Sequence, residues 1–365
     1  MSRKANILSY IFTMLFTLGA LFVAVYVCDA RYGGNMLSAM IKFCVGAIIA
    51  GLVHTFAHEL GHLIAGKKNG FKFSSMTVWF FRWKRVRNKI RFDFVMMGEE
   101  AGYTEMIPVS VEDVSNRLKK MTMGGVWASL IFTLIGFPAL FITSLPVWIY
   151  SILVMFLPIG AYFFFGSVLP SSTNGVRNDG AVVYGIKKDD DVSKVTTNLL
   201  KIQAELYNDK TPSEIDEDLY FNLPQLPEDN PCFAMLLSAK YAYYLDKEDY
   251  QNAKKTTERL LSIIDFMPKY FEPIIKTDAL YNACTFDFNE EKADDLMYEL
   301  EKYLNNVNTA TNVRAKMAYL LYVKREKEPL DIFYKKGVKE ANRCLIKGLG
   351  RYEKKLYDKM KCDFD

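Results

Sequence analysis

All three histidines of this 365-residue chain lie in one short stretch, "HTFAHELGHLIAG", residues 54–66. Within it, His58, Glu59 and His62 form the pattern H-E-x-x-H. On a helix, side chains four residues apart project from the same face, about one turn apart. The two imidazoles can therefore bind one zinc ion while Glu59 lies beside a water molecule at that ion. The pattern predicts a hydrolytic zinc site with Glu59 as its catalytic base.

The surroundings of the pattern support a functional reading. It lies in an apolar run from Phe43 to Ala65, where a charged side chain costs at least about 2.5–3.5 kcal/mol. His54 extends the series by four residues, but at about 1.5 Å per residue it stands about 12 Å from His62 along the helix axis. Metal–nitrogen bonds are only about 2.1 Å long, so one straight helix cannot bring all three imidazoles to one ion. We expect His54 to pack near the site or to support a ligand.

The third metal ligand must come from elsewhere in the chain. The extended pattern H-E-x-x-H-x-x-G-x-x-H fails, because Ala65 and Lys68 occupy the glycine and final histidine positions. The region where a following helix would supply a glutamate reads "WFFRWKR" and contains no acid. Among acids that flank an apolar run, Asp179 in "GSVLPSSTNGVRNDGAVV", residues 166–183, is conspicuous.

These features resemble the site-2 protease family of intramembrane zinc metalloproteases. Its members pair H-E-x-x-H on one membrane helix with N-x-x-P-x-x-x-L-D-G at another. Here Ser167 and Pro170 stand at the N and P positions, and Asn178, Asp179 and Gly180 stand at L-D-G. Ser replaces Asn, Asn replaces Leu, and about four additional residues separate the proline from the aspartate. The Asp-Gly pair itself is intact.

The resemblance implies one zinc ion per chain, held by His58, His62 and Asp179, with Glu59 as the catalytic residue. The altered motif leaves the substrate-orienting residue open, with four candidates: Ser167, Pro170, Asn174 and Asn178. Between the zinc helix and the next apolar run, residues 71–97 alternate around a basic turn and predict a β-hairpin. The "MGGVWAS" segment that follows has small residues four apart, which permit close helix contact.

Four apolar runs reach the length of about 20 residues needed to cross a bilayer. They are Ile7–Val27, Phe43–Ala65, Met121–Phe141 and Val147–Leu169. The first lacks a small-residue cleavage site, so we expect it to be retained. The segment from Lys67 to Lys120 holds twelve basic residues, whereas the loop after the first run holds only Arg31. This bias predicts a multi-pass cell-membrane protein with both termini in the cytoplasm.

The net charge of +4 mostly reflects this topology, so we expect no nucleic-acid partner. The Lys- and Asn-rich composition indicates a bacterial source.

We predict a mainly α-helical fold with a membrane-embedded metalloprotease domain at residues 1–186, a linker at 187–231 and a cytoplasmic helical domain at 232–365. In the last domain, paired helices recur about 39 residues apart, similar to a short tetratricopeptide stack. Such a stack would bind a protein or peptide; a compact bundle that only steadies the membrane domain is the alternative.

Together these observations predict an intramembrane zinc endopeptidase. We expect it to hydrolyse peptide bonds of membrane-associated proteins or small peptides near the cytoplasmic face. The alternative is a non-catalytic membrane protein that keeps the metal site and acts as a partner-binding or immunity factor through its helical tail. A zinc transporter or sensor would need acids or histidines in several apolar runs, and the other three runs contain none.

Overall fold

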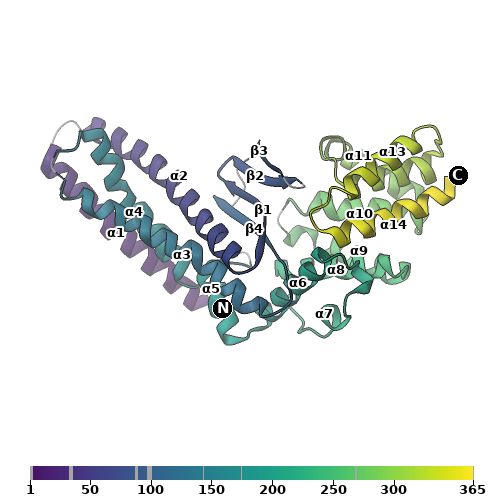
Figure 1. Ribbon diagram of the computed structural model, residues 1–365. Coiled ribbons are helices and arrows are strands. Elements are labelled where there is room, and N and C mark those ends of the chain that lie inside the picture. The colour runs from purple at the N-terminus through teal and green to yellow at the C-terminus, as the bar shows by residue number, and fades with distance from the viewer. Residues whose placement is uncertain are drawn as a thin grey trace. The chain divides into compact units, whose positions relative to one another are not determined.

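The computed structural model describes most of the chain, which divides into two compact units (Figure 1). The membrane unit comprises Met1–Arg85, Ile90–Ile107 and Asp113–Ser193, and the C-terminal unit comprises Val86–Lys89, Pro108–Glu112 and Lys194–Asp365. Within these ranges, the described residues are 3–32, 36–86, 89–96, 101–142, 144–173, 175–267 and 269–364. The described chain is mainly α-helical, as predicted.

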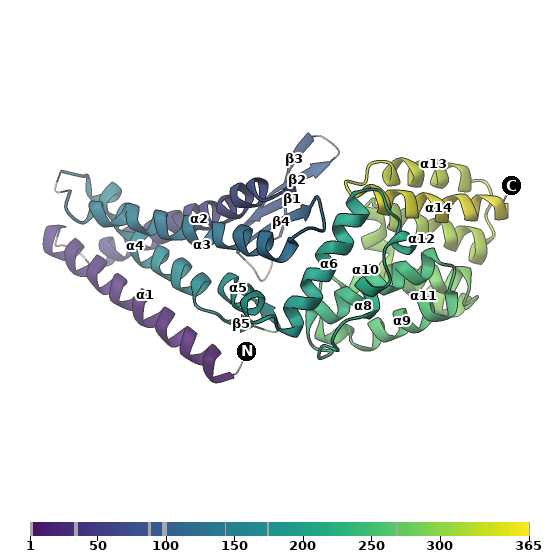
Figure 2. The same cartoon turned by 60° about the horizontal axis from the view of Figure 1, so that its bottom comes forward.

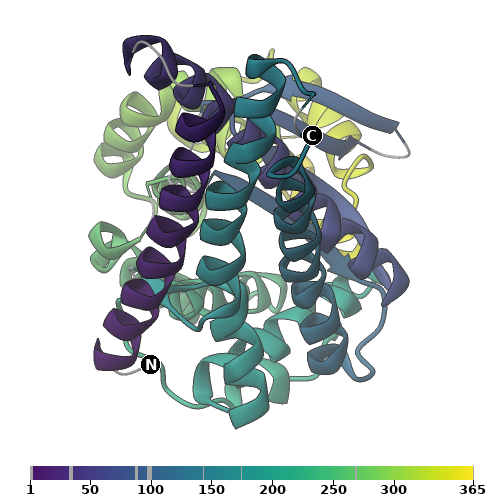
Figure 3. The ribbon, with the colours of Figure 1, turned by 90° about the vertical axis from the view of Figure 1, so that its left-hand side faces the viewer.

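Four long apolar helices make up most of the membrane unit. They are α1 (Arg3–Tyr32), α2 (Met36–Lys68), α3 (Val114–Ala139) and α4 (Val147–Val168). Each is long and apolar enough to cross a membrane, so the four predicted spans are confirmed as helices. Helices α2, α3 and α4 pack against one another, and α1 packs along α4 (Figure 3). Large apolar side chains on their outer faces, such as Phe22 and Leu134, are exposed, as expected of surfaces that contact lipid.

Small residues bring α2 and α3 into close contact. A Cβ atom added at Gly61 would lie 2.4 Å from the carbonyl oxygen of Gly124, and a Cβ atom at Gly124 would lie 2.4 Å from that of Gly61. The two helix backbones therefore touch at this point. The close approach predicted from the "MGGVWAS" segment is confirmed, because only glycine leaves room for it.

A four-stranded sheet lies between α2 and α3 in the sequence. Its strands are β1 (Phe71–Val78), β2 (Phe81–Val86), β3 (Lys89–Phe94) and β4 (Gly102–Pro108), in the order β3-β2-β1-β4. The predicted β element between the second and third apolar runs is confirmed, and β2 and β3 are neighbours in it, but the sheet has more strands than the single hairpin predicted over residues 71–97. Strand β1 turns back into an antiparallel β2 at Trp79 and Phe80, pairing Val78 with Phe81, and β4 lies beyond the predicted hairpin.

The missed turn has a physical reason. Tight turns are usually marked by Gly, Asn or Asp, but here Trp79 itself adopts the left-handed conformation, with φ of 55°. Tertiary contacts hold it there: its backbone N–H donates to the Ala101 carbonyl and its indole N–H donates to the Thr55 hydroxyl of α2. The aromatic run "VWFFRW" therefore contains a turn that its local sequence does not indicate, because the turn is stabilised by contacts with α2.

The sheet runs along the second half of α2 (Figure 2). A Cβ atom at Gly66 would collide with Met106 of β4, and a Cβ atom at Gly51 would lie 3.3 Å from the Trp79 ring. Between these two points α2 advances about 22 Å at about 1.5 Å per residue. The strands thus cover the helix over the whole stretch that carries H-E-x-x-H.

The rest of the chain is built from short elements after α4 and a series of helices. The membrane unit ends with β5 (Ser172–Thr173), β6 (Val176–Arg177), α5 (Asp179–Lys188) and the start of α6 (Asp191–Tyr207). The C-terminal unit continues with η1 (Pro212–Glu214), α7 (Asp218–Phe221), α8 (Pro231–Asp246), α9 (Tyr250–Ser262), η2 (Ile264–Phe266), α10 (Glu272–Thr285), α11 (Glu290–Asn306), α12 (Ala310–Ala318), η3 (Tyr319–Lys324), α13 (Leu330–Ala341) and α14 (Lys347–Phe364).

Successive helices of the C-terminal unit pack in pairs, α8 with α9, α10 with α11 and α12 with α13. Its likeness to a tetratricopeptide stack stays a prediction. The segment predicted as a linker carries α6, η1 and α7, and its Ile202 and Tyr220 pack with Tyr243 of α8 in one apolar cluster.

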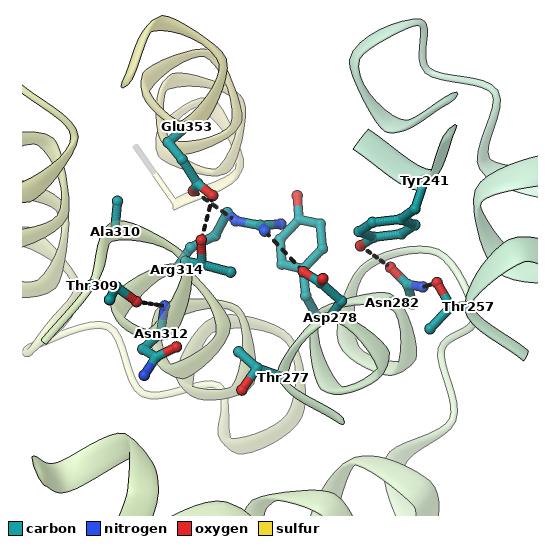
Figure 4. A network of polar contacts seen from close by, with 12 residues as sticks. Tyr241, Thr257, Thr277, Asp278, Asn282, Thr309, Ala310, Asn312, Arg314 and Glu353 are labelled. Carbon is teal, nitrogen blue, oxygen red and sulfur yellow. Dashed lines mark hydrogen bonds and ion pairs between the residues drawn. The ribbon is translucent and has the colours of Figure 1, made fainter. Parts of the chain in front are cut away.

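A buried polar network joins the helices of this unit (Figure 4). Arg314 of α12 is 1% exposed and donates from Nε to Glu353 of α14 at 2.9 Å and from Nη2 to Asp278 of α10 at 3.4 Å. Its guanidinium also lies 4.0 Å from the centre of the Tyr281 ring. Burial raises the pKa of Asp278 to about 7, although the charge of Arg314 opposes this shift. The network fixes α10, α12 and α14 to one another.

Candidate metal centre

The two histidines of α2 meet Asp179, the first residue of α5. His58 Nε2 lies 3.1 Å from Asp179 Oδ2, His62 Nε2 lies 3.5 Å from the same oxygen, and the two Nε2 atoms are 3.1 Å apart. Both histidines are 9% exposed. Helix geometry supplies the first two groups, and the chain returns through α3 and α4 to supply the third. These three side chains can hold a metal ion.

The triangle of ligand atoms has the size that zinc requires. Around a tetrahedral ion with bonds of about 2.0–2.1 Å, neighbouring ligand atoms lie about 3.3–3.4 Å apart. The separations between His58, His62 and Asp179, from 3.1 to 3.5 Å, bracket that value. Two imidazole nitrogens and one carboxylate oxygen are also a usual donor set for a zinc site with one open position. The residues present therefore fit zinc.

Helix α3 orients both imidazoles. His58 Nδ1 lies 2.8 Å from the Ser129 hydroxyl, and His62 Nδ1 lies 3.1 Å from the Met121 carbonyl. With each Nε2 directed at the metal position, each Nδ1 carries the proton and donates to its partner on α3. These bonds fix the tautomer and the ring plane of both ligands.

Gly125 lies between these two partners, one turn from each, and makes the arrangement possible. A Cβ atom there would lie 2.4 Å from His62 Nε2 and 2.9 Å from His58 Nε2. Any side chain at this position would therefore occupy the space of the ligand atoms. One stripe of α3, formed by Met121, Gly125 and Ser129, holds the imidazoles and leaves room for them.

Glu59 is buried beside the ligands, at 5% exposure, and is held by strand β4. The Thr104 hydroxyl donates to Glu59 Oε2 at 2.6 Å. A Cβ atom at Gly102 would lie 2.6 Å from the other oxygen, Oε1. One carboxylate oxygen is therefore fixed by a hydrogen bond, and the absence of a side chain at Gly102 keeps space beside the other.

Asn178 positions Asp179 at the start of α5. Its Oδ1 accepts from the backbone N–H groups of Ser171 and Ala181, each at 2.9 Å. Its Nδ2 donates to the carbonyls of Gly166 and Leu169. The side chain thus caps α5 and ties it to the end of α4, because asparagine accepts and donates at the same time. This sets the direction of the Asp179 carboxylate.

The structure describes two of the other three predicted site residues of this segment. Ser167 lies in the last turn of α4, and the Pro170 carbonyl accepts a hydrogen bond from Ser9 of α1. Asn174 lies outside the described residues. The substrate-orienting role of the segment stays a prediction.

His54 lies outside the ligand set and packs between α2, α3 and α4. It is fully buried, its Nε2 donates to the Phe156 carbonyl at 3.1 Å, and its ring stacks on Phe163 at 5.9 Å between centroids. Phe163 also contacts the ring of His58, at 6.3 Å. Phe163 therefore lies between His54 and the ligand His58.

An ion pair links the residues that precede and follow α5. Arg177 donates to both carboxylate oxygens of Asp190, at 3.0 and 2.9 Å, and to the Ser193 hydroxyl. Burial disfavours the charge of Asp190, but the bonds from Arg177 and Ser193 outweigh it and hold the pKa of Asp190 below its ordinary value. The strand before Asp179 and the turn after α5 are thus clamped together.

Several residues around the metal centre belong to no sequence motif that would identify their role. Ser129 and Gly125 stood out only as small residues of a helix contact, and Thr104 and Gly102 lay beyond the predicted hairpin. Asn178 stood out in the sequence only as a candidate for orienting the substrate, whereas in the structure it caps α5. These residues act through packing between segments that are distant in the sequence.

A zinc-binding pattern inside an apolar helix, completed by an aspartate from a second membrane-associated segment, defines the class of membrane-embedded metallopeptidases. The chain matches the model of peptidase family M50 over residues 46–327, most of its length, and it belongs to this family. The resemblance to the site-2 protease family is thereby confirmed. No curated protein and no solved structure matches the chain.

Proposed function

We propose that the protein is an intramembrane zinc endopeptidase that cleaves membrane-associated proteins or small peptides near the cytoplasmic face. One observation carries the proposal: His58, His62 and Asp179 form a triangle of zinc dimensions, and Glu59 lies next to it on the same buried helix. Family membership supports the reaction class. Zinc fits as the cofactor because of the donor set and its spacing.

Each residue near the ligands has a defined task. When bound, zinc lowers the pKa of a water molecule toward about 7 and polarises the scissile carbonyl. Glu59 accepts a proton from the attacking water and delivers it to the departing amine. Thr104 holds Glu59 Oε2, so proton transfer falls to Oε1, the oxygen that faces Gly102.

The position of the centre on α2 supports cleavage near the cytoplasmic face. The basic bias of the loops favours the cytoplasmic side for Lys67 and both termini. Counted along the helix from Lys67, the ligands lie about 8–13 Å inside the boundary. Gly51, which the sheet also reaches, lies about 24 Å inside. Non-helical backbone at such depth is tolerated only where protein buries it or water lines it, and hydrolysis at Glu59 requires that water reach this site.

Strand β4 is the best candidate for binding the substrate backbone. A helical substrate must unwind before hydrolysis, because its peptide groups are hydrogen-bonded within the helix. The sheet order places β4 at one edge, and its Thr104 contacts Glu59. An unwound segment added beside β4 would lie next to the catalytic base. We therefore propose β4 as the edge that binds the substrate backbone.

The C-terminal unit supports a second role within the same protein. We propose that its paired helices bind a protein or peptide and so select or deliver substrate. The pairing of α8 with α9, α10 with α11 and α12 with α13 supports a repeat-like arrangement.

Metal analysis and a proteome comparison test the proposal together. The full-length protein and its Glu59→Gln variant are purified in detergent for zinc analysis, and membrane peptides are compared between cells that carry each form. A matched control is Glu112→Gln, an exposed glutamate in the turn before α3. We expect close to one zinc per chain in all three proteins and an uncut substrate that accumulates only with Glu59→Gln. Loss of a general base lowers turnover by about 100-fold or more.

Two outcomes would overturn the proposal in different ways. Identical peptide profiles for wild type and Glu59→Gln, with zinc bound in both, would favour a non-catalytic protein that works through its helical tail. Absence of zinc from the wild-type protein would contradict the metal site itself.

A further inference from the structure

Helix α1 makes specific polar contacts with the segment that leads to Asp179. Asn6 Nδ2 donates to the Ser172 carbonyl at 2.7 Å, and the Ser172 N–H donates to Asn6 Oδ1 at 2.8 Å. The Ser9 hydroxyl donates to the Pro170 carbonyl at 2.7 Å. These three bonds attach the first two turns of α1 to β5 and to Pro170, the second residue after α4.

A fourth contact completes this clamp. The hydroxyl of Tyr10 lies 2.6 Å from that of Thr173. Residues 6, 9, 10 and 13 follow helical spacing, so they form one stripe of α1. Thr13 is 5% exposed near Gly166, and Phe16 stacks on Phe165 of α4 at 4.0 Å. Thr13 and Phe16 therefore continue the stripe into the packing of α1 on α4.

The clamped segment leads directly to the metal ligand. Strand β5 pairs with β6, with Ser172 opposite Arg177, and Asp179 follows two residues later. The Asn178 N–H also donates to the Ser171 carbonyl at 3.0 Å, next to the residue that Asn6 holds. Asn6 therefore connects to Asp179 through a continuous set of backbone hydrogen bonds.

We infer that α1 is part of the metal centre and that Asn6 is a positioning residue, which holds Asp179 in ligand geometry through Ser172 and the β5–β6 pair. An asparagine amide satisfies the N–H and the carbonyl of Ser172 together, as a neighbouring strand would. Without it, Ser9 still holds Pro170 and Tyr10 still contacts Thr173, but Ser172 between them loses both of its bonds to α1. The aspartate would then sample positions outside bonding distance of the ion. The inference rests on the zinc site of the proposed function.

Zinc affinity of the full-length protein in detergent, measured by competition with a chromophoric chelator, tests the inference. Asn6→Leu removes both hydrogen bonds at similar size, and we expect zinc affinity to fall about 10-fold, at the lower end of the range for residues that orient ligands. Asn6→Gln, which keeps the amide, should recover part of the affinity. The matched control is Thr17→Val, because the Thr17 hydroxyl donates to the Thr13 carbonyl within α1 itself.

A double variant separates positioning from general destabilisation. If Asn6 acts through the aspartate, Asn6→Leu should have almost no further effect on zinc affinity in an Asp179→Ala background. Equal fold losses in both backgrounds, or wild-type affinity of Asn6→Leu, would overturn the inference. A wild-type protein that binds no zinc would contradict the proposed metal site as well, so the two failures are distinguishable.

Discussion

Gly125 offers the sharpest test of the metal centre. In the Gly125→Ala variant the new Cβ atom would lie 2.4 Å from His62 Nε2 and 2.9 Å from His58 Nε2, whereas ordinary contacts begin at 3.4 Å. The His62 nitrogen must therefore move by about 1 Å, while metal–ligand distances tolerate about 0.2 Å. Because this atom is the far end of a side chain, the ring can swing aside with little damage to the fold.

We expect zinc affinity to fall by about 100-fold or more, equivalent to about 2.7 kcal/mol. The zinc-free protein should keep its thermal midpoint or gain slightly, because alanine favours a helix over glycine by about 0.5–1 kcal/mol. Zinc competition in detergent measures the first quantity and a thermal scan with chelator measures the second. The stabilisation that added zinc gives the wild type should be largely lost.

Two further glycines act as controls. Gly19→Ala on α1 adds a methyl group with nothing within 4 Å, so zinc affinity should be unchanged. Gly124→Ala would drive a Cβ atom into the backbone of Gly61, so it should lower stability by forcing α2 and α3 apart. Wild-type zinc affinity in Gly125→Ala would refute the reasoning, because the ligand atoms could not then lie where the structure places them.

Three other predictions concern hydrogen bonds and burial. Ser129→Ala removes the partner of His58 Nδ1 and should weaken zinc binding about 10-fold by chelator competition. Thr104→Val removes the bond to Glu59 and should lower the cleavage rate about 10-fold with zinc content unchanged. Burial raises the pKa of Asp278 to about 7 in the folded state, against about 3.9 unfolded. Stability should therefore fall as pH rises through this window, and calorimetry of Asp278→Asn should show a flatter pH dependence. Unchanged zinc affinity in Ser129→Ala would contradict the first prediction, and an unchanged cleavage rate in Thr104→Val the second. A pH dependence of stability in Asp278→Asn equal to that of the wild type would contradict the third.

Much of the membrane fold was predictable from local patterns. The four apolar runs became α1 to α4, because about 20 apolar residues can satisfy their backbone in a membrane only as a helix. The sheet was less predictable. Trp79 adopts a left-handed turn that residues around Thr55 and Ala101 stabilise, so its signal lay outside the local sequence.

Some residues of the candidate site could likewise be predicted from the sequence, and others could not. Four-residue spacing placed His58 and His62 on one face, and the Asp-Gly pair pointed to Asp179. The residues that make these ligands usable, Gly125 and Ser129, could not be assigned from sequence alone. Their roles depend on the register of α3 against α2, which close packing decides.

The sequence by itself determined what the helix repeat enforces: two imidazoles on one face of an apolar helix, with an acid at the adjacent position, whatever surrounds them. Only the tertiary structure decided that Asp179 closes the triangle and that α1, α3 and β4 hold its members in place. The physical reason is the distance along the chain over which each interaction acts. Helical spacing is set by bonds within a few residues, whereas the ligand triangle is set by the packing of segments that meet only after the chain has folded.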